Sequence, residues 1–222
     1  MELLLHLVLA AYFVLYVFAW SIPPVYLHVP SAGLQQPLKV ASHSNLDTWL
    51  KQQEHIATDN LLANIAGGRN APDAALGSVI ASPSKNHPNY YFQWVRDAAI
   101  TMQTVVNLYT RSGSTNSTIM DILNAYNDIS YQLQHTSNPS GDFHDLSGLG
   151  EPKFMPDGSA FTGNWGRPQR DGPALRALTL MSYLKAVNET RPALWTSTDG
   201  LDFFKDLYHA SMPAYSTIKA DL

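Results

Sequence analysis

Cysteine is absent from this sequence of 222 residues. Disulfide bonds, thiolate metal sites and cysteine nucleophiles are therefore excluded, although a domain of this size can be secreted without disulfides. Charged residues are also scarce, because they make up only 14% of the chain and its 14 Lys and Arg residues form no basic block. We therefore expect no nucleic-acid partner.

Patterns that hold metal ions or cofactors are equally sparse. The strongest candidate is the run from Asp142 to Asp145, in which a single histidine stands between two aspartates. A zinc site in a protein normally takes about three or four ligands from the chain. We therefore expect no metal ion and no cofactor.

The chain does contain a long apolar N-terminus. Residues 3–20 carry no formal charge, and the first lysine is Lys39. A signal peptide usually has a basic start and an apolar core of about 7–15 residues. Here Glu2 replaces the basic start, and the run approaches the length of roughly 18–20 residues that spans a bilayer. Residues 1–22 are therefore interpreted as a cleaved signal peptide or an uncleaved membrane anchor, with a buried core helix as a third alternative.

Both leading alternatives direct the protein into the secretory pathway. We expect it to be secreted or located in the cell wall or vacuole, and to be membrane-anchored only if the N-terminal segment is retained. Two sequons for N-glycosylation, at Asn116 and Asn188, fit this route. A polar, proline-containing linker is expected over residues 23–43, followed by the folded domain over residues 44–222.

Apolar residues beyond the linker recur at helical spacing. Helices are predicted from Ser44 or Asn45 to Gly67-Gly68, from Asp97 to Thr110, from Ser117 to His135 and from Asp171 or Gly172 onward, with shorter pieces over 201–208 and after Pro213. Residues 77–84 are expected to hold one short strand at most. The predicted fold class is all-α, and the chain is interpreted as truncated within its last helix.

The apolar spacing also predicts which helical residues face the core. The second predicted helix should bury Ile100, Val105, Val106 and Tyr109. The helix from Ser117 should place Ile119, Ile122, Leu123, Tyr126, Ile129 and Leu133 on one stripe. The helix from Asp171 should turn Leu175, Leu178, Met181 and Leu184 inward.

The first cluster with chemical potential is residues 89–102, where aromatic side chains precede Arg96 and Asp97. A structural interpretation makes the aromatic residues core, pairs Arg96 with Asp97 and lets Asp97 cap the next helix. A functional interpretation uses the same residues to bind a sugar. A carboxylate beside a guanidinium can hold two neighbouring hydroxyls, while the C–H face of the sugar ring packs on an aromatic side chain.

The second cluster is residues 147–177, a Gly-rich stretch that carries Glu151, Asp157 and Asp171. Three carboxylates on such a loop are compatible with general acid and base catalysis. We favour a structural interpretation, in which Glu151 and Lys153 are solvated and Asp171 caps a helix. Arg170 and Arg176 would then hold the loop through carbonyl and carboxylate groups.

Four stretches in and around these clusters resemble the fungal glucoamylases of glycoside hydrolase family 15. They are ASPSKNHPNYYFQWVRDAAITM (81–102), SNPSGDF (137–143), GLGEPKFMPDGSAFTGNWGRPQRDGPALRA (148–177) and PAYSTIKADL (213–222). The resemblance runs in the family's order from about Ser42 to Leu222, and the longest motif is highly specific.

The resemblance implies an (α/α)6 barrel of the six-hairpin glycosidase type, here incomplete and truncated at the C-terminus. It also implies the activity of a glucan 1,4-alpha-glucosidase. Enzymes of this family release β-D-glucose from the non-reducing ends of starch-type and glycogen-type glucans, cleaving α-1,4 bonds and, more slowly, α-1,6 bonds. The reaction inverts the anomeric centre, which requires an acid and a base roughly 6.5–9.5 Å apart. We expect an α-glucan as the partner and a monomeric protein.

The resemblance also assigns residues. Arg96 and Asp97 match the pair that grips the hydroxyls of the terminal glucose, and Tyr90 and Trp94 match aromatic residues of the same subsite. Trp165 matches the tryptophan beside the catalytic acid. The arginines of the second cluster match structural positions.

The acid and base themselves are not matched in this chain. In the family the acid belongs to a Trp-Glu-Glu segment, which does not occur in these 222 residues, and the base lies much further on. The leading expectation is therefore a glucoamylase sequence that holds part of the substrate site without the catalytic pair. The alternatives are a non-catalytic, secreted or membrane-anchored glucan-binding remnant and a purely structural all-α domain.

Overall fold

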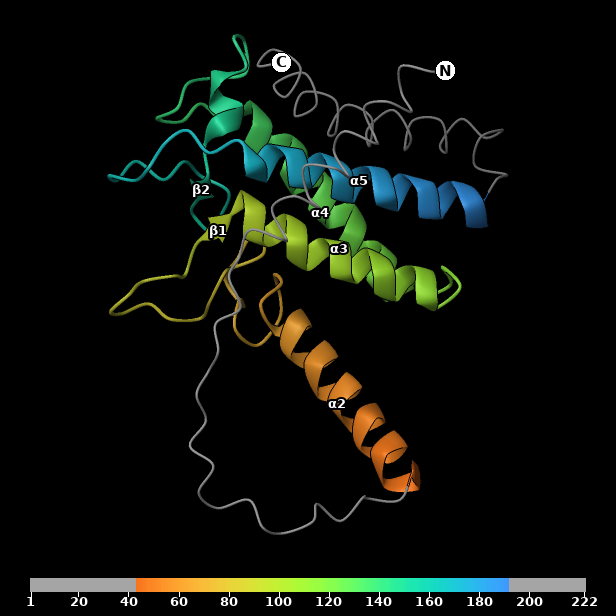
Figure 1. Ribbon diagram of the computed structural model, residues 1–222. Coiled ribbons are helices and arrows are strands. Elements are labelled where there is room, and N and C mark those ends of the chain that lie inside the picture. The colour runs from red at the N-terminus through yellow and green to blue at the C-terminus, as the bar shows by residue number, and fades with distance from the viewer. Residues whose placement is uncertain (1–42, 192–222) are drawn as a thin grey trace, which may run out of the picture. The chain divides into compact units, whose positions relative to one another are not determined.

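The computed structural model describes residues 43–191, most of which are helical (Figure 1). Four helices lie in this range: α2 (His43–Ala63), α3 (Val95–Arg111), α4 (Ser117–His135) and α5 (Asp171–Thr190). They correspond to the four helices that the sequence predicts there, so the all-α class is confirmed. Several predictions fall outside the described residues. They concern residues 1–22, nearly all of the linker, and the helical pieces over 201–208 and after Pro213.

The helix starts follow from local sequence. Asn116 is the N-cap of α4, where its side chain accepts a hydrogen bond from the backbone N–H of Ile119 at 3.1 Å. Helix α5 begins at Asp171 with Pro173 in its first turn, as predicted. Helix α3 begins at Val95, two residues before the predicted start, because a short strand leads directly into it.

Two short strands are the main feature that the sequence does not predict. Strand β1 (Gln93–Trp94) pairs antiparallel with β2 (Lys153–Phe154), so that Trp94 lies opposite Lys153. Two residues are too few to show a periodic pattern. Within residues 77–84, Val79 forms only an isolated bridge with Ile65. The pairing of β1 with β2 brings the long loop before α5 to the start of α3.

The core lies between α3, α4 and α5. Its buried members from these helices include Val105, Tyr109, Leu123, Tyr126, Ile129, Leu133, Leu180 and Tyr183. Two contacts connect the helices directly: the rings of Tyr109 and Tyr183 meet edge to face at 5.9 Å, and the Thr179 hydroxyl donates to the Ala99 carbonyl at 3.0 Å. The described residues from Asp47 to Arg191 belong to one compact unit.

The predicted inward faces are partly wrong. On α3, Val105, Val106 and Tyr109 are buried but Ile100 is 54% exposed. On α5, Leu178 is 55% exposed and Met181 41% exposed, while the buried residues include the small Gly172, Ala177 and Ala186 beside the larger Leu180 and Tyr183. Apolar residues lie all around α5, so periodicity alone cannot select a face. Close packing against Ala98 and Ala99 of α3 favours the side with small residues.

Helix α2 makes few contacts along most of its length. Leu46, Trp49 and Leu50 are about half exposed, whereas Leu61 and Leu62 near its C-terminal end pack against the core. Within residues 43–191, no helix combines the length and the apolar character needed to cross a bilayer. The choice between signal peptide and anchor concerns residues outside this range and stays a prediction.

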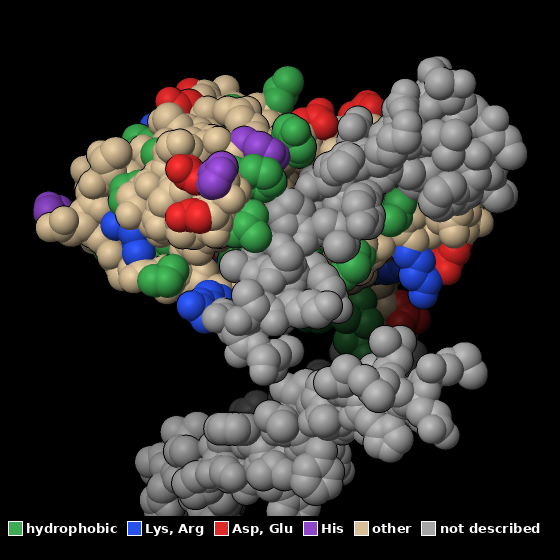
Figure 2. Space-filling view, turned by 90° about the horizontal axis from the view of Figure 1, so that it is seen from above, with side chains coloured by type: hydrophobic (Ala, Val, Ile, Leu, Met, Phe, Trp, Pro, Cys, Tyr) green, Lys and Arg blue, Asp and Glu red, His purple; other side chains and the backbone are tan. Residues whose placement is uncertain are grey.

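The face shown in Figure 2 carries its Lys and Arg side chains in small separate groups rather than as one basic surface. This distribution agrees with the charge pattern of the sequence, which has no basic block.

Candidate functional site

Three segments meet where α3 and α5 begin. They are β1, β2 and the loop that leads into α5, and Figure 1 shows both strands at the end of the helix pair where α3 and α5 start. Helices α3 and α5 lie side by side there. Their approach is so close that a Cβ on Gly172 of α5 would lie 3.1 Å from the backbone nitrogen of Arg96. The two clusters identified in the sequence therefore form one region.

The aromatic residues expected to bind sugar form a continuous row. The ring centroids of Tyr90 and Trp94 lie 5.7 Å apart, and those of Trp94 and Trp165 also lie 5.7 Å apart, edge to face. Trp94 in the middle is 6% exposed, whereas Tyr90 and Trp165 at the two ends are 44% and 43% exposed. We call Tyr90, Trp94 and Trp165 the aromatic wall. It presents two open rings to solvent on a buried support.

Two further rings stand behind the aromatic wall. Phe92 lies 5.8 Å from Trp94 and 5.2 Å from Phe161, both edge to face. Neither phenylalanine is among the site residues expected from the sequence. Their positions depend on the pairing of β1 with β2, which short-range sequence patterns do not show.

Lys153 lies between these rings and not in solvent as expected. Its residue is only 4% exposed, and its ammonium nitrogen lies 3.6 Å from the ring centroid of Phe161, 4.1 Å from Trp165, 4.3 Å from Phe92 and 5.1 Å from Trp94. Burial lowers the pKa of Lys153 below its ordinary value, and the nearby charge of Arg167 lowers it further, while Glu151 acts in the opposite direction. The expectation of a solvated Lys153 is wrong because β2 turns this side chain inward.

Glu151 is also buried, at 1% exposure, which again corrects the expectation of a solvated side chain. Its Oε2 accepts hydrogen bonds from Arg167 Nε at 2.6 Å and from the Ser140 hydroxyl at 3.1 Å. A buried carboxylate is tolerated when it is paired and hydrogen-bonded in this way. The carboxylate of Glu151, a candidate for acid and base catalysis in the sequence, therefore has a structural role as the partner of Arg167.

Arg167 holds the loop that carries Trp165. Besides its ion pair with Glu151, it donates to the carbonyls of Phe161 at 2.9 Å, Gly163 at 2.9 Å and Trp165 at 3.4 Å. The planar guanidinium suits several fixed acceptors at once. The structural role expected of the second-cluster arginines is thus seen at Arg167.

Arg176 does not take that role among the described residues. It is 3% exposed, and within residues 43–191 its Nε has no hydrogen-bond partner. Burial lowers the pKa of Arg176 to about 10, with a smaller opposing effect from Tyr126. No local pattern in the sequence predicts that this charge would be buried.

Arg96 connects the two clusters. Its Nη1 donates to Asp171 Oδ2 at 3.0 Å and to Gln169 Oε1 at 3.4 Å, while its Nη2 lies 3.6 Å from Asp97 Oδ2. The hydrogen bond from Arg96 lowers the pKa of Asp171, and the same bond raises the pKa of Arg96. The main interaction of the Asp171 side chain is therefore its ion pair with Arg96.

Neither aspartate is an N-cap. The N-cap of α3 is Trp94, which makes no side-chain capping bond, and Asp97 lies within the first turn. Asp171 is likewise in the first turn of α5, where its Oδ1 accepts from the Gly172 N–H at 3.0 Å. Asp171 lies at the positive end of the α5 dipole, which favours the charged form of its carboxylate. Asp97 Oδ2 accepts no hydrogen bond from the described residues.

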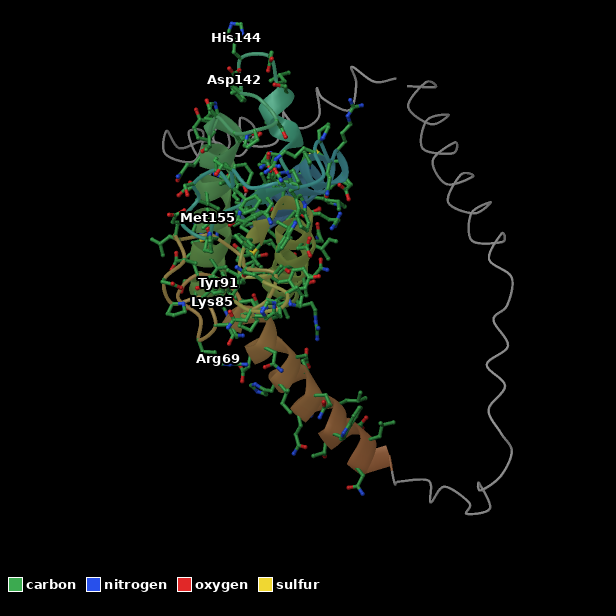
Figure 3. All side chains as sticks on the ribbon, turned by 90° about the vertical axis from the view of Figure 1, so that its left-hand side faces the viewer. Arg69, Lys85, Tyr91, Asp142, His144 and Met155 are labelled. Carbon is green, nitrogen blue, oxygen red and sulfur yellow. The ribbon has the colours of Figure 1, made fainter. Side chains whose placement is uncertain are left out.

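Two surface cavities lie beside the aromatic wall rather than on it. One, of about 340 Å³, is lined by Ser140, Leu146 and Arg167 among others. The second, of about 360 Å³, includes Lys85, Tyr91 and Met155, which Figure 3 shows near one another.

The run from Asp142 to Asp145 lies away from this region. Figure 3 shows Asp142 and His144 at the outer end of their loop, remote from Tyr91 and Lys85. Among the described residues, no three His, Asp or Glu side chains are grouped so as to hold a metal ion.

Comparison with known proteins agrees with this architecture. The family described as "Glycosyl hydrolases family 15" matches residues 55–210. The chain belongs to this family. Glucoamylase GLA1 of Saccharomycopsis fibuligera is 48% identical over 164 residues, which are 72% of this chain and 31% of that protein. An intracellular, sporulation-specific glucoamylase of Saccharomyces cerevisiae is 35% identical over 171 residues, which are 74% of this chain and 30% of that protein.

The solved structures show the same relationship. A glucoamylase structure from Saccharomycopsis fibuligera superposes with a TM-score of 0.68 and 44% identity, covering 76% of this chain and 36% of that one. The likeness confirms the expected helical architecture as part of the family's (α/α)6 barrel. The chain spans between 22% and 35% of the length of these curated glucoamylases.

Proposed function

We propose that this chain supplies part of the glucan-binding surface of a glucoamylase. The enzyme would remove terminal glucose from the non-reducing ends of starch-type and glycogen-type glucans, cleaving α-1,4 bonds and, more slowly, α-1,6 bonds. The observation that carries the proposal is the aromatic wall standing next to Arg96 and Asp97 at the start of α3. Exposed rings beside a carboxylate and a guanidinium suit the two faces of a pyranose.

Each group would have a distinct role. Tyr90 and Trp165 are open to solvent and would pack against C–H faces of the sugar, while buried Trp94 supports both rings. Asp97 would accept hydrogen bonds from sugar hydroxyls, and Arg96 would donate to them. Asp171 holds Arg96 from the opposite side, so the guanidinium is oriented before a ligand arrives.

The reaction would invert the anomeric centre and release β-D-glucose. Inversion needs a protonated carboxyl group at the leaving oxygen and a carboxylate that activates water on the other face. No carboxylate of this chain matches either role in the family. Glu151 and Asp171 are engaged in ion pairs with Arg167 and Arg96. We therefore propose that these 222 residues alone bind glucan without hydrolysing it.

Binding is tested by titrating the 222-residue protein with maltotriose and following tryptophan fluorescence. Saturable quenching is expected, and Trp165→Ala should weaken binding roughly twofold to tenfold, since an aromatic contact contributes about 0.5–1.5 kcal/mol. Asp97→Ala should also weaken it. Trp49→Ala is the matched control, because Trp49 is also exposed, at 54% against 43% for Trp165, but lies on α2. Equal loss in the control, or no binding by the unaltered protein, would contradict the proposal.

Hydrolysis is tested separately with soluble starch. No glucose release is expected from the 222-residue protein. Release that Asp97→Ala abolishes would show that the catalytic pair is present after all. The alternative of a glucan-binding remnant is distinguished at the gene: a coding sequence that continues into a Trp-Glu-Glu segment favours the enzyme, and an authentic stop after Leu222 favours the remnant.

We further propose entry into the secretory pathway, glycosylation at the sequons and a monomeric state. The uncharged run over residues 3–20 supports the secretory route. The two Asn-X-Thr sequons support glycosylation, and Asn116 of the first sequon is exposed. N-terminal sequencing of the mature protein decides the first point. A start between residues 21 and 31 shows a cleaved signal peptide, and retention of Met1 with membrane fractionation shows an anchor.

A further inference from the structure

The ammonium of Lys153 is enclosed by aromatic rings from two different segments. Phe92 and Trp94 belong to the segment of β1, and Phe161 and Trp165 belong to the loop before α5. Lys153 itself is on β2, directly opposite Trp94 in the strand pair. One cation thus contacts two members of the aromatic wall, Trp94 and Trp165, which come from different segments.

The rings are the main partners of this charge. Within residues 43–191, no carboxylate oxygen lies within 4.0 Å of the ammonium, so Lys153 forms no direct ion pair there. Glu151 acts on its charge from a longer distance. A lysine that is 4% exposed loses most of its hydration. Attraction between a cation and the faces of aromatic rings within about 6 Å replaces part of that loss. The attraction depends on the ring faces pointing at the nitrogen, so it acts on ring orientation.

Arg167 cannot provide the same restraint. It binds the carbonyls of Phe161, Gly163 and Trp165, and so fixes the backbone of the loop. The indole of Trp165 is still 43% exposed, and its side-chain torsions are not set by backbone hydrogen bonds. Lys153 contacts the ring itself, at 4.1 Å from its centroid.

We propose that Lys153 is a positioning residue, whose ammonium holds the indole of Trp165 edge to face against Trp94 and thereby sets the shape of the aromatic wall. The inference rests on the proposed function for its significance to glucan binding. The orientation of the ring can be measured without any sugar.

Two substitutions separate charge from bulk. Lys153→Met keeps the length of the side chain and removes the cation, and Lys153→Arg keeps the cation. Lys51→Met on α2 is the control, because Lys51 is exposed. The near-ultraviolet circular dichroism spectrum of the tryptophans should differ from that of the unaltered protein in Lys153→Met. It should be the same as that of the unaltered protein in Lys153→Arg and Lys51→Met. In a Trp165→Phe background the effect of Lys153→Met should disappear, which assigns the signal to that ring.

An alkaline titration tests the same point without a substitution. The charged groups that face Lys153 are Glu151 and Arg167, and burial with the Arg167 charge holds the pKa of Lys153 below its ordinary value of 10.5. The tryptophan signal of the unaltered protein should therefore change with a midpoint below pH 10.5. Lys153→Arg should lack the transition, because arginine stays protonated in this range.

The outcomes are decisive even if Lys153→Met does not fold, as far-ultraviolet circular dichroism would show. A transition in the unaltered protein that is missing in Lys153→Arg supports the inference. An unchanged tryptophan spectrum in folded Lys153→Met, or a titration identical in unaltered protein and Lys153→Arg, overturns it.

Maltotriose binding distinguishes this inference from the proposed function. Lys153→Met should bind more weakly by a factor comparable to Trp165→Ala, roughly twofold to tenfold. If the tryptophan signal depends on Lys153 but the unaltered protein binds no sugar, the positioning role stands and the proposed function fails. If the unaltered protein binds and Lys153→Met binds equally well, the positioning role fails.

Discussion

Arg96 and Asp171 are separated by 75 residues in the chain and joined by a hydrogen bond of 3.0 Å. Arg96 lies in the first turn of α3, and Asp171 lies in the first turn of α5. Their ion pair therefore ties together the starts of the two helices that frame the aromatic wall. Because both partners are close to half exposed, the pair contributes only modestly to global stability, and its larger effect is on the orientation of Arg96.

The first prediction concerns pH and Asp171. The hydrogen bond from Arg96 lowers the pKa of this carboxyl below its ordinary value of 3.8. A lowered pKa in the folded state means that the stabilisation is complete above 3.8 and is lost as the pH falls through the folded-state pKa. Asp171→Asn should therefore flatten the decrease in unfolding free energy between pH 5 and the acid range, as measured by urea denaturation at a series of pH values.

Asp47→Asn serves as the control, because Asp47 is an exposed residue of α2 outside this region. The other aspartates with lowered pKa values, Asp73, Asp145 and Asp157, remain in both proteins and contribute equally. Identical pH profiles for Asp171→Asn and the unaltered protein would contradict the prediction.

The second prediction concerns the buried ion pair of Glu151 and Arg167. Their side chains are 0% and 13% exposed. Glu151→Gln leaves the guanidinium buried without a counter-charge and beside Lys153, so the unfolding free energy should fall by about 3–5 kcal/mol. Glu54→Gln breaks the exposed pair with Arg111 at 2.7 Å and should cost less than about 1 kcal/mol. Equal costs in urea denaturation would show that burial does not matter here.

The third prediction concerns the hydrogen bond between α5 and α3. Thr179→Val removes the hydroxyl that donates to the Ala99 carbonyl at nearly unchanged volume, while that carbonyl keeps its helical hydrogen bond within α3. The expected loss of unfolding free energy is about 0.5–1.5 kcal/mol. Thr104→Val is the matched control, since its hydroxyl bonds only to the Ile100 carbonyl on the exposed surface of the same helix as Ala99. A cost at position 104 as large as at 179 would refute the assignment.

The fourth prediction concerns Gly77, which has a φ of +82° and lies against α4. A Cβ at this position would lie 2.0 Å from the Ala125 carbonyl oxygen, so Gly77→Ala must displace backbone. Left-handed strain of about 1–2 kcal/mol is then added to an overpacking cost of about 1–3 kcal/mol. Gly113→Ala shares the positive φ but meets nothing within 4 Å, and should show the strain alone. Thermal unfolding of both variants measures the difference.

Local signals in the sequence were sufficient for the helices. The caps and apolar periods located α4 at both ends and α5 at its start, because these features act within a few residues of one another. The same signals failed for the inward face of α5, where Leu178 and Met181 are exposed. An element with apolar residues on every side acquires its orientation only from its neighbours.

The residues of the aromatic wall were also identified from the sequence, through their resemblance to a family. Their mutual arrangement, and the place of Lys153 and Glu151 behind them, were not. The strand pair that turns Lys153 inward joins residues 59 and 61 positions apart and has only two residues on each side.

By itself, the sequence determined the helical class, the family and the identity of the residues expected to meet a sugar, because composition, caps and motifs are local properties. Tertiary structure alone decided which charges are buried and what they face. Glu151 pairs with Arg167, Arg96 with Asp171, and Lys153 with four rings. The physical reason is that a charge is buried only where distant segments supply a matching partner, and those partners meet only when the chain folds.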